Sequence, residues 1–239
     1  MKLVELYRYP IKSAAAQSIR QAHFGPLGLE GDRQRVLASS DGRFVTAREC
    51  PRLARIHWAD STLEYCGQRS PAVTFSGEDQ VVSIWKRTQS GVSASAAVND
   101  WLSDVLEQPV TLLQLPSNES QHYGDSQPVM VLFRETAQRI ERALGRPFSA
   151  LQLRPNLVID GGEAFTEKTL TTLQVGSVTL AAVEPCTRCK MINLAPDTEV
   201  YPRPLDVSST LMQLQPGFVA GHHFAVASPG LCALGDSIQ

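Results

Sequence analysis

The 239-residue chain lacks any apolar run close to the roughly 20 residues that a membrane-spanning helix needs. Its first residues also lack the basic and apolar pattern of a secretory signal peptide. Five cysteines, an odd number without framework spacing, argue against a disulfide-stapled secreted domain. These absences predict a cytoplasmic protein without a membrane span, whose thiols stay reduced.

An excess of charge of one sign is also missing. Lysine and arginine number 22, aspartate and glutamate 24, and the formal net charge is −2. This balance gives no overall attraction to nucleic acid or to an anionic membrane. The sequence contains no P-loop, Rossmann glycine fingerprint, internal repeat or low-complexity segment. With 43% hydrophobic residues, the chain is long enough to bury a packed core.

What the first half contains is short apolar runs separated by turn residues, a pattern typical of a β-barrel or sandwich. Strands are expected at residues 3–7, 35–38, 55–59 and 81–85. One helix is predicted over residues 95–105, because Ser95 can cap it, apolar residues recur at helical spacing and Pro109 follows.

The second half follows a polar stretch at residues 115–123, which we interpret as a domain junction. A buried strand is expected at 128–133 and a second helix around 137–144. Further strands are expected at residues 156–160, 173–175, 178–183, 190–195 and 218–227, with a last short strand near 238. The sequence therefore predicts an α+β, predominantly β protein with domains at 1–116 and 117–239.

One stretch carries chemistry that packing alone would not select. Cys186, Arg188 and Cys189 follow the apolar strand 178–183, which Pro185 is expected to end. Three interpretations compete for the two thiols: a ligand to a metal or cofactor, a dithiol redox pair, and two buried side chains that only fill space.

The dithiol interpretation is the weakest, because a thioredoxin-like pair opens a helix, whereas residues 190–194 are expected to be extended. A structural zinc site needs four Cys or His ligands, and the other three cysteines are scattered singly. His222 and His223 are adjacent and would point to opposite faces of a strand. Buried structural cysteines remain an open alternative.

Further motifs, in order along the chain, accompany the two cysteines. They are Tyr9-Pro10-Ile11-Lys12-Ser13, Gly28-Leu29-Glu30-Gly31-Asp32-Arg33, Thr46-Ala47-Arg48-Glu49, Arg154-Pro155-Asn156 and Pro185-Cys186-Thr187-Arg188-Cys189. The series resembles the MOSC family, which comprises the C-terminal domains of molybdenum cofactor sulfurases and free-standing relatives, including the mitochondrial amidoxime-reducing component and its bacterial homologues. The resemblance covers nearly the whole chain and implies an N-terminal β-barrel-like domain followed by a MOSC β-barrel domain.

The resemblance also implies a molybdenum cofactor, which is a pterin with a phosphate and a dithiolene that chelates the metal. It puts the metal ligand, and hence the catalytic residue, at Cys189. Thiolates suit such a metal, and neighbouring Arg188 and Lys190 are expected to lower the pKa of the thiol. The expected cofactor-binding residues are Lys12, Ser13, Arg33, Arg48, Arg154, Asn156, Thr187 and Arg188. Lys12, Ser13, Arg33, Arg48 and Arg154 are expected at the phosphate and Asn156 at the pterin edge. Thr187 is expected at the oxo group of the metal or at the pterin, and Arg188 at the pterin edge or in a structural salt bridge.

Part of the pattern departs from that of relatives which reduce N-hydroxylated compounds. Those proteins usually show a Thr-Thr pair and then Asp-Pro-x-Thr-Gly after the cysteine. Here the aligned residues are Ile192-Asn193 and then Ala195-Pro196-Asp197-Thr198-Glu199. The residues around the substrate pocket are therefore expected to differ.

The resemblance implies an oxidoreductase that removes oxygen from N-hydroxylated small molecules. No iron–sulfur, flavin or haem motif is visible, so electrons are expected from a separate ferredoxin-, flavin- or haem-type protein. Two alternatives stay open: a sulfur carrier in cofactor maturation that uses a Cys189 persulfide, and a cofactor-binding module without turnover. In the leading hypothesis the four cations share one cleft with Cys189, at the interface between the domains.

Overall fold

The computed structural model describes residues 1–116, 122–196, 198–202 and 204–239. Most of the predicted domain junction, at residues 117–121, and Asp197 of the departing motif lie outside these ranges. The strands are β1 (Lys2–Arg8), β2 (Gln17–Ser18), β3 (Gln21–Gly25), β4 (Gly28–Leu29), β5 (Arg35–Ser39), β6 (His57–Ala59), β7 (Thr62–Tyr65), β8 (Gln68–Arg69), β9 (Phe75–Ile84), β10 (Arg87–Ala94), β11 (Val110–Gln114), β12 (Val129–Phe133), β13 (Leu157–Asp160), β14 (Thr172–Val175), β15 (Val178–Thr187), β16 (Val219–Ser228) and β17 (Gly230–Ala233). The helices are α1 (Ala96–Leu106), α2 (Arg134–Leu144) and α3 (Asp206–Leu214), with 3-10 turns η1 (Pro51–Arg55), η2 (Ala150–Leu153), η3 (Thr166–Thr169) and η4 (Lys190–Asn193).

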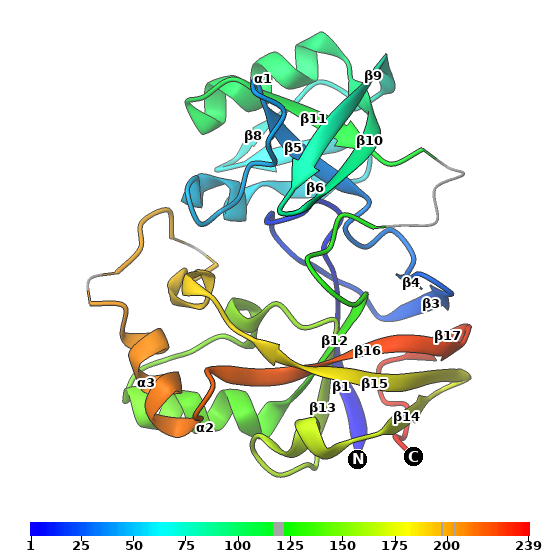
Figure 1. Cartoon of the computed structure of the whole chain (residues 1–239), viewed down its shortest axis with the longest axis vertical. Helices are drawn as coiled ribbons and strands as arrows, with labels where there is room; N and C mark the ends of the chain where they lie inside the picture. Colours follow the sequence, from blue (N-terminus) through cyan, green and yellow to red (C-terminus); the bar gives the residue numbers. More distant parts are fainter. Residues whose placement is uncertain (117–121, 197, 203) are drawn as a thin grey trace.

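The molecule has two parts, one above the other in Figure 1. The upper part holds a four-stranded sheet in the order β5-β11-β10-β9, a small sheet β6-β7-β8, and α1. The lower part holds a seven-stranded sheet in the order β14-β15-β16-β12-β13-β1-β2, a sheet β17-β3-β4, and the helices α2 and α3. The predicted α+β, predominantly β class is confirmed, and among the described residues each sheet keeps two edge strands.

The core of the lower part lies on both faces of the large sheet. All five residues of β12 are buried, and successive side chains point to opposite faces. Val129, Val131 and Phe133 join the core that includes Phe24 of β3. Met130 and Leu132 join the core that includes side chains of α2 and α3. The continuous apolar run at 128–133 is thus explained by burial on both sides.

In the upper part the predicted first helix is confirmed as α1. Val98 and Leu102 are buried in the same core as Leu37 of β5 and Leu112 of β11. Ser95 stands at the N-cap position as expected, but its side chain makes no capping hydrogen bond. Burial of the apolar face, rather than a capping hydrogen bond, therefore stabilises this helix.

Three local predictions in the second half are wrong. Strand β15 continues through Pro185 to Thr187, because the ladder to β16 shifts register on both sides of the proline and tolerates its missing N–H. Lys190–Asn193 forms a 3-10 turn rather than extended chain. Helix α3 was not expected, since its short apolar face is only Val207 and Leu211.

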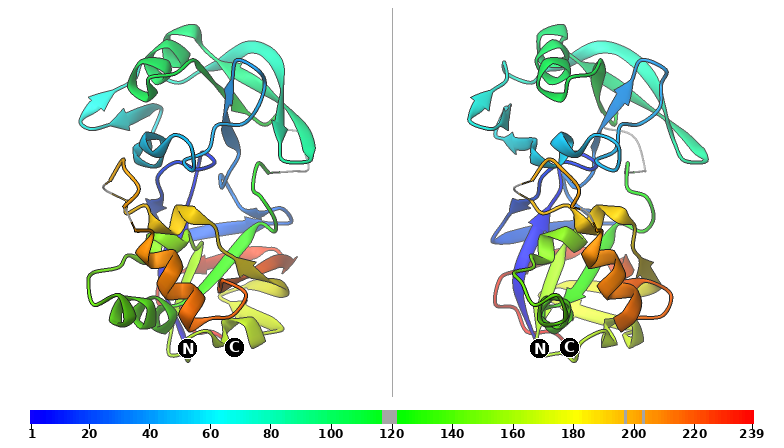
Figure 2. Two further views of the ribbon diagram at one scale, coloured as in Figure 1. Left: turned by 60° about the vertical axis from the view of Figure 1, so that its left-hand side comes forward. Right: turned by 90° about the vertical axis from the view of Figure 1, so that its left-hand side faces the viewer.

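The chain passes between the two parts more than once, as Figure 2 shows from two further sides. Strand β1 pairs with β13 and β2 in the lower sheet, and β3 pairs with β17, so the N-terminal residues belong to the lower part. Residues 9–16 and 30–34 connect these strands to each other and to the upper sheet. The predicted division at residue 116 stays a prediction.

None of the helices among the described residues is long and apolar enough to cross a membrane. The cytoplasmic location stays a prediction.

Candidate functional site

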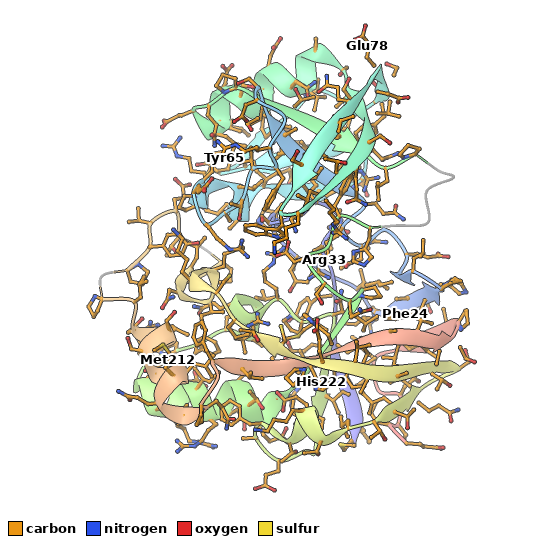
Figure 3. All side chains as sticks on the ribbon, viewed as in Figure 1. Phe24, Arg33, Tyr65, Glu78, Met212 and His222 are labelled. Atoms are coloured by element: carbon orange, nitrogen blue, oxygen red, sulfur yellow. The ribbon has the colours of Figure 1, made fainter. Side chains whose placement is uncertain are left out.

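A cavity lies where the two parts meet, and its volume is about 880 Å³ including the mouth that opens to solvent. Its wall includes eight of the predicted site residues: Lys12, Ser13, Arg33, Arg48, Arg154, Thr187, Arg188 and Cys189. Figure 3 shows Arg33 between the upper and lower parts. The structure therefore brings the four predicted cations and Cys189 to one cavity, while their binding roles stay predictions.

Three of these residues have a left-handed backbone conformation, which residues other than glycine rarely adopt. The φ angles are 67° at Ser13, 46° at Arg33 and 54° at Arg154. Each residue lies in a connection at the junction of the two parts, after β1, before β5 and after η2 respectively. Backbone strain of this kind persists only where the surrounding structure enforces it, and it gathers at functional sites.

The side chain of Arg33 is held in place by hydrogen bonds to two buried polar residues, Asp32 and Asn156. It donates to the Asp32 carboxylate and, at 3.0 Å, to Oδ1 of Asn156, and its guanidinium lies 4.6 Å from the ring centre of Tyr9. Asn156 is fully buried, and its Nδ2 donates to Asp32 and to the carbonyl oxygen of Tyr7, both at 3.2 Å. Asn156, which we expected at the pterin edge, does not line the cavity; its amide orients Arg33 instead.

Arg154 carries a partly buried charge that no described carboxylate pairs with. Its guanidinium donates to the carbonyl oxygen of Ala14 at 2.8 Å and lies 4.2 Å from the ring centre of Tyr9. Burial lowers its pKa to about 10, still well above neutral pH. No ion pair involving Arg154 occurs among the described residues. A desolvated cation without a counter-ion is suited to an anionic ligand.

Asp125 is the acidic residue of the cavity, and sequence reasoning missed it. Its carboxylate accepts hydrogen bonds from Lys12 Nζ, from Trp85 Nε1 at 2.8 Å and from Arg48 at 3.4 Å. Burial would raise the pKa of Asp125, but Lys12 holds it below its ordinary value. Burial in turn lowers the pKa of Lys12 to about 8, against the pull of Asp125. A single aspartate in a polar loop has no pattern that would have revealed it.

The two thiols have different surroundings. Cys186 is buried, burial raises its pKa, and its sulfur accepts a hydrogen bond from Arg188. Cys189 is partly exposed, and Arg48 Nε lies 3.3 Å from its sulfur. Lys190 instead stacks over the ring of Tyr201, 5.3 Å from the ring centre. Arg188 and Lys190, the sequence neighbours of Cys189, therefore contact other groups, and Arg48, a residue far away in the sequence, contacts the Cys189 sulfur.

One histidine also reaches the cavity. His223 of β16 lines it, whereas His222 does not, as alternation along a strand requires. Burial, together with Arg188 and Arg33, lowers the pKa of His223 to about 4, so the imidazole is neutral at pH 7. Within the described residues, no three or more His, Cys, Asp or Glu side chains are grouped to hold a metal ion by themselves.

The lining thus sets five cations, Lys12, Arg33, Arg48, Arg154 and Arg188, against the one carboxylate of Asp125. A cavity with this balance favours an anionic ligand, and the partly exposed thiol offers that ligand a soft sulfur.

Comparison with known families agrees with this arrangement. The MOSC N-terminal beta barrel domain matches residues 1–109, and the MOSC domain matches residues 118–239. The chain belongs to the MOSC family. The resemblance inferred from the motifs is confirmed.

Relatives of this MOSC chain carry two kinds of name. Mitochondrial amidoxime-reducing component 1 of Danio rerio is 26% identical over 99% of the chain and 83% of its own length. The human protein of that name is 25% identical over 99% and 82%. Molybdenum cofactor sulfurase of Drosophila erecta is 26% identical over 90% of the chain, but over only 30% of its own length. The YuaD protein of Bacillus subtilis shares the fold, with a TM-score of 0.51 at 14% identity, over 99% of this chain and 93% of that one.

The residues that depart from the reductase pattern of the family have structural partners here. Ile192 is buried in the cavity wall. Asn193 donates to Ser208 Oγ at 2.6 Å and accepts from its backbone N–H at 3.0 Å, which joins η4 to the first turn of α3. Glu199 accepts from Tyr65 at 2.6 Å and from Arg55 at 2.7 Å, both in the upper part. Through Asn193 and Glu199, the segment after Cys189 is hydrogen-bonded to α3 and to the upper part.

Proposed function

We propose that this MOSC protein binds a molybdenum cofactor in the cavity, with Cys189 as the protein ligand to the metal, and reduces N-hydroxylated small molecules. The observation that carries the proposal is the partly exposed sulfur of Cys189, opening into a cavity walled by five cations and contacted by Arg48. The relatives named amidoxime-reducing components support the same choice of reaction.

The residues present fit such a cofactor. Arg154, partly buried and without a described carboxylate partner, would hold the phosphate together with Lys12 and Ser13. Thr187 and Arg188 lie on the same wall as Cys189 and would face the pterin. Arg33 Nη1 donates to Asp32 and Asn156, and its Nη2 donates to the carbonyl oxygen of Arg154 at 3.4 Å, so Arg33 would contribute mainly positive charge to the site.

When bound, the cofactor supplies two-electron chemistry at molybdenum, which with two electrons and two protons converts the N-hydroxyl oxygen to water. Cys189 would hold the metal through its sulfur, and Arg48 places a positive charge beside that sulfur. His223 stays neutral near pH 7 and adds no positive charge to the wall. Electrons come from a separate donor protein of the ferredoxin, flavin or haem type.

A second candidate is sulfur transfer during cofactor maturation, with Cys189 carrying a persulfide. The contact between Arg48 and the Cys189 sulfur favours any anionic sulfur, so it suits a persulfide as well as a metal-bound thiolate. A third is a cofactor-binding module without turnover.

The three functions are separated by one preparation of the protein from a host that makes the cofactor. Molybdenum content and pterin fluorescence are measured first, and turnover of benzamidoxime with reduced viologen second. Molybdenum with turnover supports the reductase, and molybdenum without turnover supports the binding module. A cyanide-labile sulfur on Cys189 in protein free of molybdenum supports the sulfur carrier and contradicts the leading proposal.

A further inference from the structure

The tip of the β9–β10 hairpin points from the upper part toward the lower part (Figure 1). Ile84 pairs with Arg87, so Trp85 and Lys86 form a two-residue turn. Trp85 has a φ angle of 56°, at the first turn position, where glycine or asparagine is usual. A bulky aromatic residue with this backbone is an outlier that local sequence preference does not explain.

Three contacts orient the Trp85 ring. Its Nε1 donates to Asp125 at 2.8 Å, the Arg48 guanidinium lies 4.6 Å from its centre, and the Phe44 ring meets it edge-on at 4.9 Å. The residue nevertheless remains 56% exposed. A tryptophan needed only for packing would be buried, whereas this one is held in place with much of its ring open.

The open ring borders a second cavity, whose volume is about 890 Å³ including the part that opens to solvent. Its wall includes Phe44, Val45, Cys50 and Trp85, with Arg48 also present. Arg48 lines both cavities, and its Nε is the atom that contacts the Cys189 sulfur. A molecule seated against Trp85 therefore has one end at Arg48, next to the reactive sulfur.

We propose that Trp85 and Phe44 form a subsite for a planar aromatic ring of the substrate, whose polar N-hydroxylated end lies at Arg48 beside Cys189. The assignment of the polar end rests on the proposed function. The ring stacks on the open part of Trp85, as flat π systems do on tryptophan, whereas a saturated ring of the same size lacks that interaction. Trp85 is thus a specificity-determining residue, and the strained turn places its ring at the second cavity.

The test is a calorimetric titration of the purified protein, without reductant, using benzamidoxime and its saturated counterpart cyclohexanecarboxamidoxime. We expect benzamidoxime to bind about tenfold more tightly, in line with the typical strength of an aromatic pair. Trp85→Phe should keep most of this preference, and Trp85→Ala should lose it. Absence of benzamidoxime binding, equal binding of the two compounds, or an unchanged preference in Trp85→Ala would overturn the subsite.

A variant that restores the usual turn residue separates ligand binding from folding. In Trp85→Gly the left-handed backbone is relaxed, so we expect the melting temperature to stay level or rise while the aromatic preference disappears. A marked fall in melting temperature would show that Trp85 is a packing residue. Because the titration needs no turnover, an aromatic preference in protein that lacks reductase activity would refute the proposed reaction and leave the subsite standing.

Discussion

At the scale of single residues, the sharpest prediction concerns Cys189. Replacing it with serine exchanges a soft thiolate for a hard hydroxyl that stays protonated at neutral pH. We expect molybdenum to be lost or labile and reductase activity to vanish, while the contacts of Lys12 and Arg154 still retain some pterin. Because the sulfur lies on a cavity wall, the free energy of unfolding should change by about 1 kcal/mol or less. Molybdenum per chain is the deciding measurement.

Cys186→Ser is the matched control, because Cys186 is buried and hydrogen-bonded to Arg188, whereas Cys189 is partly exposed. The serine variant should keep its metal and lose some stability, because a hydroxyl replaces a sulfur in an apolar core. Full metal retention in Cys189→Ser, or metal loss confined to Cys186→Ser, would reverse the assignment.

Lys12 makes anion binding depend on pH. Burial lowers its pKa to about 8, so the folded protein holds the Lys12 charge below this pH and loses it above. Sulfate, whose own charge is constant in this range, should therefore bind several-fold more weakly at pH 9 than at about pH 7. Lys12→Arg, which stays charged, should flatten the profile measured by calorimetry. A wild-type affinity independent of pH would show that Lys12 does not hold the anion.

The same pKa shift has a definite sign for stability. The unfolded chain keeps the Lys12 proton up to its ordinary pKa, whereas the folded chain releases it above about 8. Between these values the unfolded state binds more protons, so the contribution of Lys12 to the free energy of unfolding rises with pH. Below about pH 8 both states are charged, and the burial of the ammonium destabilises the fold by a constant amount.

The sequence revealed the site residues that stand in motifs, and it did not reveal those that only the fold brings to the site. Lys12, Arg33, Arg48 and Arg154 stand in recognisable motifs, and all four line the cavity. Asp125 and Trp85 stand in no such motif, and they matter only because the fold brings distant loops together. Likewise Arg48, 141 positions from Cys189 in the sequence, contacts its sulfur, whereas neighbouring Lys190 turns toward Tyr201.

At the scale of elements, Glu199 links the segment between η4 and α3 to the upper part. Its carboxylate accepts from Arg55 of η1 and Tyr65 of β7. Arg55 and Glu199 are partly exposed, so their ion pair contributes little, and the hydrogen bond from the buried Tyr65 contributes about 1 kcal/mol. Glu199→Ala should lower the free energy of unfolding by about 1–2 kcal/mol and speed proteolytic cleavage near residue 199.

Glu107→Ala is the control for Glu199. Glu107 also pairs with an arginine of η1, Arg52, at 2.7 Å, but its side chain is 68% exposed. Its loss should change the free energy of unfolding by less than about 0.5 kcal/mol. Equal effects of the two substitutions, in denaturant unfolding and in proteolysis, would mean that Glu199 does not join the two parts.

Elements with strong periodicity were predictable, and those that depend on distant partners were not. Strand β12 is buried on both faces, which leaves a continuous apolar run in the sequence. Helix α1 is buried on one face, which leaves apolar residues at helical spacing. Both patterns can be read from the sequence. The prediction that Pro185 ends its strand was wrong, because the register shifts in the pairing with β16 let the strand continue through the proline. Helix α3 was missed because Asn193, outside the helix, bonds its first turn through Ser208.

At the scale of the whole molecule, the cavity exists because the chain crosses between its two parts. Lys12 and Ser13 follow β1 of the lower sheet, and Arg33 precedes β5 of the upper one. Both crossings hold a left-handed residue, at Ser13 and Arg33. The lower part also takes strands from both ends of the chain, so its folding and the assembly of the cation cluster depend on contacts distant in sequence.

The distribution of cysteines over the whole molecule bears on electron supply. Cys50 lies in the core of the upper part, Cys232 in that of the lower part, and Cys66 at the surface, all apart from the Cys186–Cys189 pair. No four of the five are therefore placed to ligate an iron–sulfur cluster, and the chain has no Rossmann fingerprint for a nicotinamide. We therefore predict that electrons reach the cavity from a separate donor protein.

Loaded with molybdenum and purified alone, this chain should be inactive with NADH or NADPH and should turn over N-hydroxylated substrate with reduced viologen. The reason is access: the cavity opens to solvent, so a small reductant can reach the site that a donor protein would otherwise serve. The measurement compares product formed per molybdenum with each reductant under the same anaerobic conditions. Turnover with a nicotinamide alone would mean that the chain contains a redox centre of its own, and a separate donor protein would then be unnecessary.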